Sequence, residues 1–90
     1  MGEFQAVSAL SLDQAKALIA LGRAIGELRR EKGMTQEDLS ERVKLHESYI
    51  SFIESGRRNP TWGTVLRISR GLDVPMIELV QRAEAPKRKR

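Results

Sequence analysis

The sequence predicts an all-α protein, a compact five-helix bundle that contains a helix-turn-helix. Three observations support this fold class. Apolar residues recur at the spacing of amphipathic helices over most of the 90-residue chain. Residues 35–56 have the pattern of two short helices joined by a tight turn. No segment has the pattern of a strand, so we expect one domain with a single small helical core.

The first helix is expected to begin at Ser11, which forms a capping box with the Gln three residues later. No proline interrupts the helical pattern before Gly33, where the helix should end. Gly22 and Gly26 lie four residues apart and would let another helix approach closely. Residues 12–18 are an N-terminal extension, which either covers the core or contacts a partner subunit. The apolar face consists of Leu18, Leu21, Ile25 and Leu28.

The central pair of helices is predicted over residues 36–43 and 47–55. Thr35 is a favourable N-cap, and Asp38 stands three residues later in the capping-box position. Gly56 follows the second helix, where a left-handed residue is favoured. Each helix is too short to be stable alone in water, so both must pack on a surrounding bundle. Their inward-facing residues are Leu39, Val43, Ile50 and Ile53.

Two further helices are predicted after the central pair. Thr61 is a good N-cap for a helix from Trp62 to about Gly71, in which we expect Trp62 to pack on the core rather than stack on a base. The last helix should start around Pro75, a residue that suits a first turn, and end near Ala83. Its apolar residues exceed what one small core needs.

The placement of charge is more informative than its sum. The net charge is +4, and the tail Lys87–Arg90 alone accounts for it. Acidic residues gather on the first helix of the central pair, whereas none lies between Gly56 and Gly71. This separation favours a nucleic-acid partner. The arginines of the acid-free segment are Arg57, Arg58, Arg67 and Arg70.

Composition argues against several other functions. With one histidine and no cysteine, the chain has no ligand set at metal spacing, and we expect no metal, no cofactor and no enzymatic activity. No apolar run approaches a membrane span and no signal peptide is visible, so we expect a cytoplasmic protein. We divide the chain into a disordered segment over 1–10, which could be a cloning remnant, a helix-turn-helix domain over 11–85 and a basic tail over 86–90.

The segment GMTQEDLSERVKLHESYISFIESGRRNP (residues 33–60) resembles the Cro and phage-repressor (XRE-type) helix-turn-helix family. The resemblance extends from about Ile19 to Val80 and implies a lambda-repressor-like DNA-binding domain. Three positions depart from the family pattern: Ser40 replaces Ala, Lys44 replaces Gly in the turn, and His46 replaces a Ser, Thr or Asp cap. Lys44 can take a positive φ at modest cost, so the turn should survive. The weaker cap at His46 makes the start of the second helix less certain.

In this motif the exposed residues in the first half of the second helix face base edges in the major groove. The resemblance also implies an interior ion pair between Arg29 and Glu54. We expect Glu47 to accept from a cytosine amino group and Phe52, predicted to be exposed, to touch a thymine methyl group. The base-contact candidates are Glu47, Ser48, Ser51 and Phe52. The backbone-contact candidates are Gln36, Lys44, His46, Tyr49, Arg57, Arg58 and Asn59.

One helix-turn-helix reads too few base pairs to specify a site, so such domains commonly dimerise on a palindrome. We expect a sequence-specific transcriptional regulator that binds double-stranded DNA as a homodimer, similar to restriction–modification controller proteins. Met76, Ile77 and Val80 of the last helix are the candidate dimer contacts. Two alternatives are an antitoxin-type protein-interaction module and a non-specific binder that acts through the basic tail.

Overall fold

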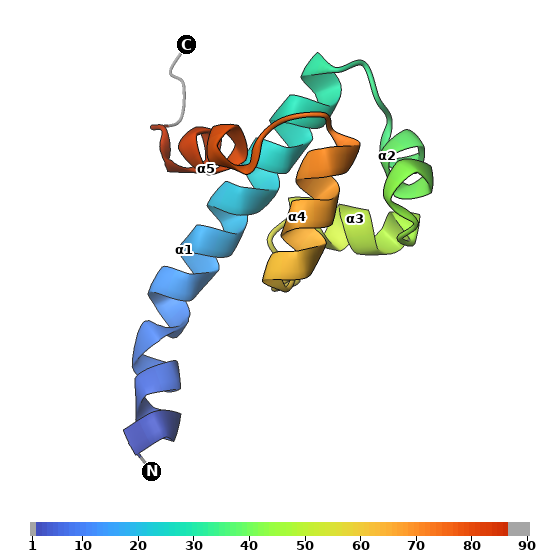
Figure 1. Cartoon of the computed structure of the whole chain (residues 1–90). Coiled ribbons are helices and arrows are strands. Elements are labelled where there is room, and N and C mark those ends of the chain that lie inside the picture. The colour runs from blue at the N-terminus through green and yellow to red at the C-terminus, as the bar shows by residue number, and fades with distance from the viewer. Residues whose placement is uncertain (1, 87–90) are drawn as a thin grey trace.

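The computed structural model describes residues 2–86, with side chains from residue 12 onward, and all five helices fall in this part (Figure 1). They are α1 (Gly2–Glu31), α2 (Gln36–Val43), α3 (Glu47–Glu54), α4 (Trp62–Gly71) and α5 (Met76–Glu84). Residues 2–86 contain no strand, which confirms the predicted all-α class. The basic tail Lys87–Arg90 lies outside the described residues.

Helix α1 begins at Gly2, so the predicted start at Ser11 is wrong. Residues 2–10, for which no regular structure was expected, belong to the helix. The N-terminal turns of α1 run out beyond the other helices (Figure 1). Leu12 is 67% exposed and Ile19 is 57% exposed, so these side chains do not cover the core.

Local hydrogen bonds set the limits of the short helix α2. The hydroxyl of Thr35 accepts from the backbone N–H of Asp38, and Asp38 Oδ2 accepts from the backbone N–H of Thr35, each at 2.9 Å. The bond from the Thr35 backbone lowers the pKa of the Asp38 carboxyl group. Lys44 ends the helix with φ of 60°, as the sequence predicted for this turn. The guanidinium of Arg67 donates to the carbonyls of Val43 (2.9 Å) and Lys44 (3.0 Å), which are left free at the helix end.

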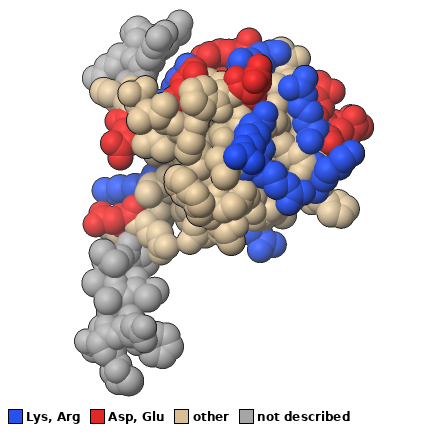
Figure 2. Space-filling view, viewed as in Figure 1, with Lys and Arg blue, Asp and Glu red and all other residues tan. Residues whose placement is uncertain are grey.

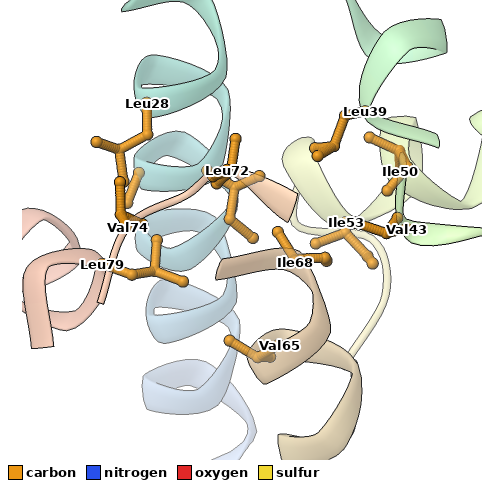
Figure 3. Close-up of a cluster of buried hydrophobic side chains, with 12 residues drawn as sticks. Leu28, Leu39, Val43, Ile50, Ile53, Val65, Ile68, Leu72, Val74 and Leu79 are labelled. Carbon is orange, nitrogen blue, oxygen red and sulfur yellow. The ribbon is translucent and has the colours of Figure 1, made fainter. Parts of the chain in front are cut away.

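The core is a single apolar cluster to which every helix contributes (Figure 3). Ile50 and Ile53 of α3 are buried in it, as predicted, and hold this short helix against the bundle. Trp62, by contrast, is 68% exposed at the start of α4, so the prediction that it packs on the core is wrong. The buried apolar residues are Ala24, Ile25, Leu28, Leu39, Val43, Ile50, Ile53, Val65, Ile68, Leu72, Val74 and Leu79.

Helix α5 is fixed to α1 by charged side chains around the buried Leu79. Arg82 forms two hydrogen bonds with Glu31, at 2.7 and 3.1 Å, and approaches Glu27 at 3.3 Å. The hydrogen bond to Glu31 raises the pKa of Arg82. No helix in the described part of the chain is long and apolar enough to cross a membrane.

Candidate nucleic-acid interface

Helix α3 buries one side in the core and presents the other side outward. Glu47 and Ser48 are exposed at its first turn, whereas Ser51 and Phe52 are half-buried one turn later. The prediction that Phe52 is exposed is therefore wrong. The helix starts at Glu47, the predicted residue, although His46 makes no side-chain capping hydrogen bond. The four predicted base-contact residues thus share α3, with Glu47 and Ser48 the most accessible.

The C-terminal end of α3 is tied to α1 and α2 through Glu54. Arg29 donates to both carboxylate oxygens of Glu54, from Nε at 2.6 Å and from Nη2 at 3.0 Å. Both side chains are only 9% exposed, which confirms the predicted interior ion pair. Arg29 also donates to the carbonyl of Met34 at 2.8 Å, and Gln36 donates to Glu54 Oε1 at 3.0 Å. This cluster fixes the position of α3 relative to the start of α2.

Gln36 was predicted to contact the DNA backbone, and its side chain has a partner within the protein. The half-buried side chain donates to Glu54. The backbone N–H groups in the first turn of α2 can still donate to a ligand, except that of Asp38, which donates to the Thr35 hydroxyl. We keep Gln36 as a candidate phosphate contact through its backbone rather than through its side chain.

The glycines of α1 let α3 come close, as the sequence predicted. A side chain at Gly22 would collide with the backbone carbonyls of Ile53 and Glu54, and one at Gly26 would lie 3.1 Å from Glu54 Oε1. The last turn of α3 therefore rests directly on the backbone of α1. Together with the Arg29–Glu54 pair and the two core residues of α3, this close contact helps to set the direction of its outward side.

The chain reverses after α3 in a way that brings Arg58 over Phe52. Gly56 has φ of 79°, in the left-handed region that favours glycine. The backbone N–H of Arg57 then donates to the carbonyl of Phe52 at 2.8 Å. The guanidinium carbon of Arg58 lies 5.8 Å from the centre of the Phe52 ring, within the range of a cation–π contact. Arg58, predicted as a phosphate contact, is thus held at the C-terminal end of α3.

The remaining backbone-contact candidates differ in how accessible they are. Lys44, His46, Arg57 and Asn59 are exposed, and Tyr49 is half-buried against the core. They flank α3 at both ends, since Lys44 and His46 precede it and Arg57 and Asn59 follow it. The structure therefore leaves these cationic and polar side chains free to approach a ligand that α3 contacts.

Other basic side chains are bonded to backbone carbonyls within the fold. Figure 2 shows Lys and Arg side chains gathered near α4 and α2 on the face in view. Arg42 donates to the carbonyl of Gly71 at 3.1 Å, and Arg67 caps α2. The sequence grouped Arg67 with Arg57 and Arg58 because all lie in one acid-free segment. In the structure Arg67 differs from them, because its guanidinium is bonded to the carbonyls of Val43 and Lys44 at the end of α2.

The candidate dimer contacts are also unequal. Ile77 is 63% exposed and Val80 is 43% exposed on α5, whereas Met76 is half-buried and packs against the core. Ile77 and Val80 therefore remain available for a partner, and Met76 is largely used within the chain. Among the described residues there is no group of three His, Asp or Glu side chains that could hold a metal ion.

Comparison with known proteins identifies relatives of this arrangement. The helix-turn-helix family profile matches residues 25–79, which include α2, α3 and α4 entirely. The uncharacterized HTH-type transcriptional regulator y4dJ of Sinorhizobium fredii is 43% identical over 60 residues, covering 67% of this chain and 78% of that protein. The crystal structure of the restriction-modification controller protein C.AhdI from Aeromonas hydrophila superposes with a TM-score of 0.67 at 35% identity, covering 69% of this chain and 94% of C.AhdI.

A further solved structure contains DNA. The restriction-modification controller protein C.Esp1396I, crystallised as a tetramer in complex with its natural 35 base-pair operator, superposes with a TM-score of 0.68 at 38% identity. The alignment covers 74% of this chain and 93% of that protein. The resemblance thus extends to a protein whose complex with an operator is known.

Proposed function

The chain belongs to the helix-turn-helix family of DNA-binding transcriptional regulators, and we propose that it regulates transcription by binding a palindromic double-stranded DNA operator as a homodimer. The observation that carries this proposal is the outward side of α3, with Glu47 and Ser48 exposed and cationic side chains at both helix ends. The C.Esp1396I tetramer on its operator supports binding by more than one copy.

The proposed mechanism divides the work between two groups of side chains. Residues of α3 enter the major groove and discriminate among bases, with Ser48, Ser51, Glu47 and Phe52 as the candidates. Lys44, Arg57 and Arg58 neutralise phosphates, and Asn59 donates hydrogen bonds to them, which adds affinity for every sequence alike. In keeping with its family, we propose that the chain binds DNA without catalysing a reaction, and that it does so in the cytoplasm.

Ser48 and Arg57 separate these two roles experimentally. Replacing Ser48 with Leu should change which operator is preferred, because good base-edge contacts contribute about 1–3 kcal/mol of discrimination. Arg57→Ala should weaken binding to operator and random duplexes together. It should also make the negative slope of log K against log salt shallower by about one unit, because one phosphate contact is lost. The measurement is titration of both duplexes over a salt series, with the operator enriched by the wild-type protein from a random pool.

Two outcomes would contradict this assignment of roles. If Arg57→Ala altered sequence preference at an unchanged salt slope while the Ser48 variant left preference intact, the two roles would be interchanged. If neither variant affected DNA binding, α3 would not be the reading helix, and a protein-interaction module would replace the present proposal.

Dimer formation is expected to depend on the exposed apolar residues of α5. Ile77→Asp should shift the protein to the monomer, because it places a charge in the centre of an apolar contact, where desolvation is costly. Met76 is half-buried within the chain, so Ile77 and Val80 carry the proposed contact. Sedimentation equilibrium measures the change, with Glu84→Gln, exposed near the end of α5, as the matched control. An Ile77→Asp protein that dimerises normally would exclude α5 and direct attention to α1 around Leu12 and Ile19.

A further inference from the structure

Two neighbouring arginines follow α3, and their side chains have different contacts. Arg57 and Arg58 are both exposed. The Arg58 guanidinium lies over the ring of Phe52, with 5.8 Å between the guanidinium carbon and the ring centre. Among the described residues, the side chain of Arg57 has no corresponding hydrogen bond or ring contact. The two side chains therefore have the same charge and adjacent positions but unequal freedom.

The backbone explains why only Arg58 reaches the ring. Ser55 ends α3, and Gly56 turns the chain with φ of 79°. The bond from the Arg57 N–H to the Phe52 carbonyl, at 2.8 Å, closes this turn on the last part of the helix. The side chain of residue 58 can therefore reach the side chain of residue 52. Phe52 is half-buried, so its ring is held by the protein and offers a fixed face to the guanidinium.

We propose that Phe52 is a positioning residue for Arg58, a role that takes the place of the thymine contact expected for Phe52 from the sequence, and that the two side chains bind DNA as one unit. The inference rests on the proposed function, since it concerns how α3 meets DNA. A long arginine side chain normally loses conformational entropy when it is fixed on a phosphate or a base edge. Contact with the Phe52 ring removes part of this cost before DNA arrives. Arg58 then contributes more affinity than Arg57, although both carry the same charge.

A double-mutant cycle tests this coupling. The variants of the full-length protein are Phe52→Leu, which keeps an apolar side chain without a ring, Arg58→Ala, and the pair combined. Phe52→Leu alone should weaken binding to the enriched duplex about fivefold, in the range expected for re-ordering one long side chain. In the Arg58→Ala background the same change should alter the dissociation constant less than about twofold, because its effect acts through Arg58.

Three controls separate positioning from a general structural effect. Phe52→Tyr retains the ring and should restore wild-type affinity. Combining Phe52→Leu with Arg57→Ala should give multiplied effects, because Arg57 is not held by the ring. Phe52→Leu should leave the salt slope unchanged, whereas Arg58→Ala should lower it by about one unit if Arg58 binds a phosphate.

The free protein gives an independent readout. The ring should shift the NMR signals of the Arg58 side-chain protons to high field, and this shift should disappear in Phe52→Leu and persist in Phe52→Tyr. Independent effects of Phe52→Leu and Arg58→Ala on binding, or Arg58 signals unaffected by the ring, would overturn the inference while leaving the proposed function intact. A wild-type protein that enriched no duplex would overturn both.

Discussion

Glu54→Ala is expected to lower the free energy of unfolding by about 3 kcal/mol, because it leaves the Arg29 guanidinium charged and buried without its counter-charge. Both side chains of the pair are only 9% exposed, so the remaining guanidinium is poorly solvated where it lies. Glu54 also accepts from Gln36 at 3.0 Å, and this hydrogen bond disappears as well. Urea unfolding at a fixed protein concentration measures the change, because stability of a dimer depends on concentration.

The matched control is an ion pair at the surface. Glu31 is 56% exposed where it meets Arg82, so Glu31→Ala should lower the free energy of unfolding by about 1 kcal/mol or less. Replacing both Arg29 and Glu54 with apolar residues should cost less than Glu54→Ala alone, because no unpaired charge is left in the interior. If Glu54→Ala unfolded at the same urea concentration as the wild type, the pair would not be buried in solution.

The sequence was sufficient to predict features that depend only on residues close together in the chain. Thr35, Lys44 and Thr61 determine where α2 begins, where it ends and where α4 begins, and each acts within a few residues of its own position. These boundaries were predicted correctly. The interior pair of Arg29 and Glu54 was predicted through the family resemblance, because its members are 25 residues apart and no local pattern connects them.

The sequence was insufficient where a side chain's environment depends on the tertiary fold. Trp62 was expected in the core, but it stands at the very start of α4 and is 68% exposed. Whether the bundle covers the end of a helix is decided by the tertiary fold and not by helical spacing. Arg67 looks like a free surface cation until α4 packs beside the end of α2. Gln36 meets Glu54 only once α2 and α3 are assembled.

The Phe52 and Arg58 contact had a detectable local signal. A residue in αL conformation after a helix reverses the chain, and Gly56 was correctly predicted at that position. That reversal returns the following residues towards the last turns of the helix. An arginine two residues after the glycine could therefore have been expected to approach the aromatic ring. The assignment of base and phosphate contacts, in contrast, depends on the position of DNA and stays a prediction.

The close approach of α1 and α3 leads to a second large effect on stability. Gly22→Ala is expected to lower the free energy of unfolding by about 3 kcal/mol, at the upper end for overpacking, because the new methyl group meets the backbone of α3. A Cβ atom at position 22 would lie 2.5 Å from the carbonyl oxygen of Glu54 and would also collide with that of Ile53. Backbone atoms cannot rotate away as a side chain can, so α3 would have to move as a unit and strain the Arg29–Glu54 pair.

The same substitution elsewhere in the chain should have the opposite sign. Ala is favoured over Gly within helices by up to about 1 kcal/mol, so where space is available the change should stabilise. Gly63 in α4 offers this control, since the nearest atom to a Cβ there is the Thr61 hydroxyl oxygen at 3.9 Å. Gly63→Ala should therefore raise the free energy of unfolding by about 0.5 kcal/mol, measured by the same urea titration. If Gly22→Ala were as stable as Gly63→Ala, α3 would not rest on the backbone of α1, and the orientation of its outward side would have another cause.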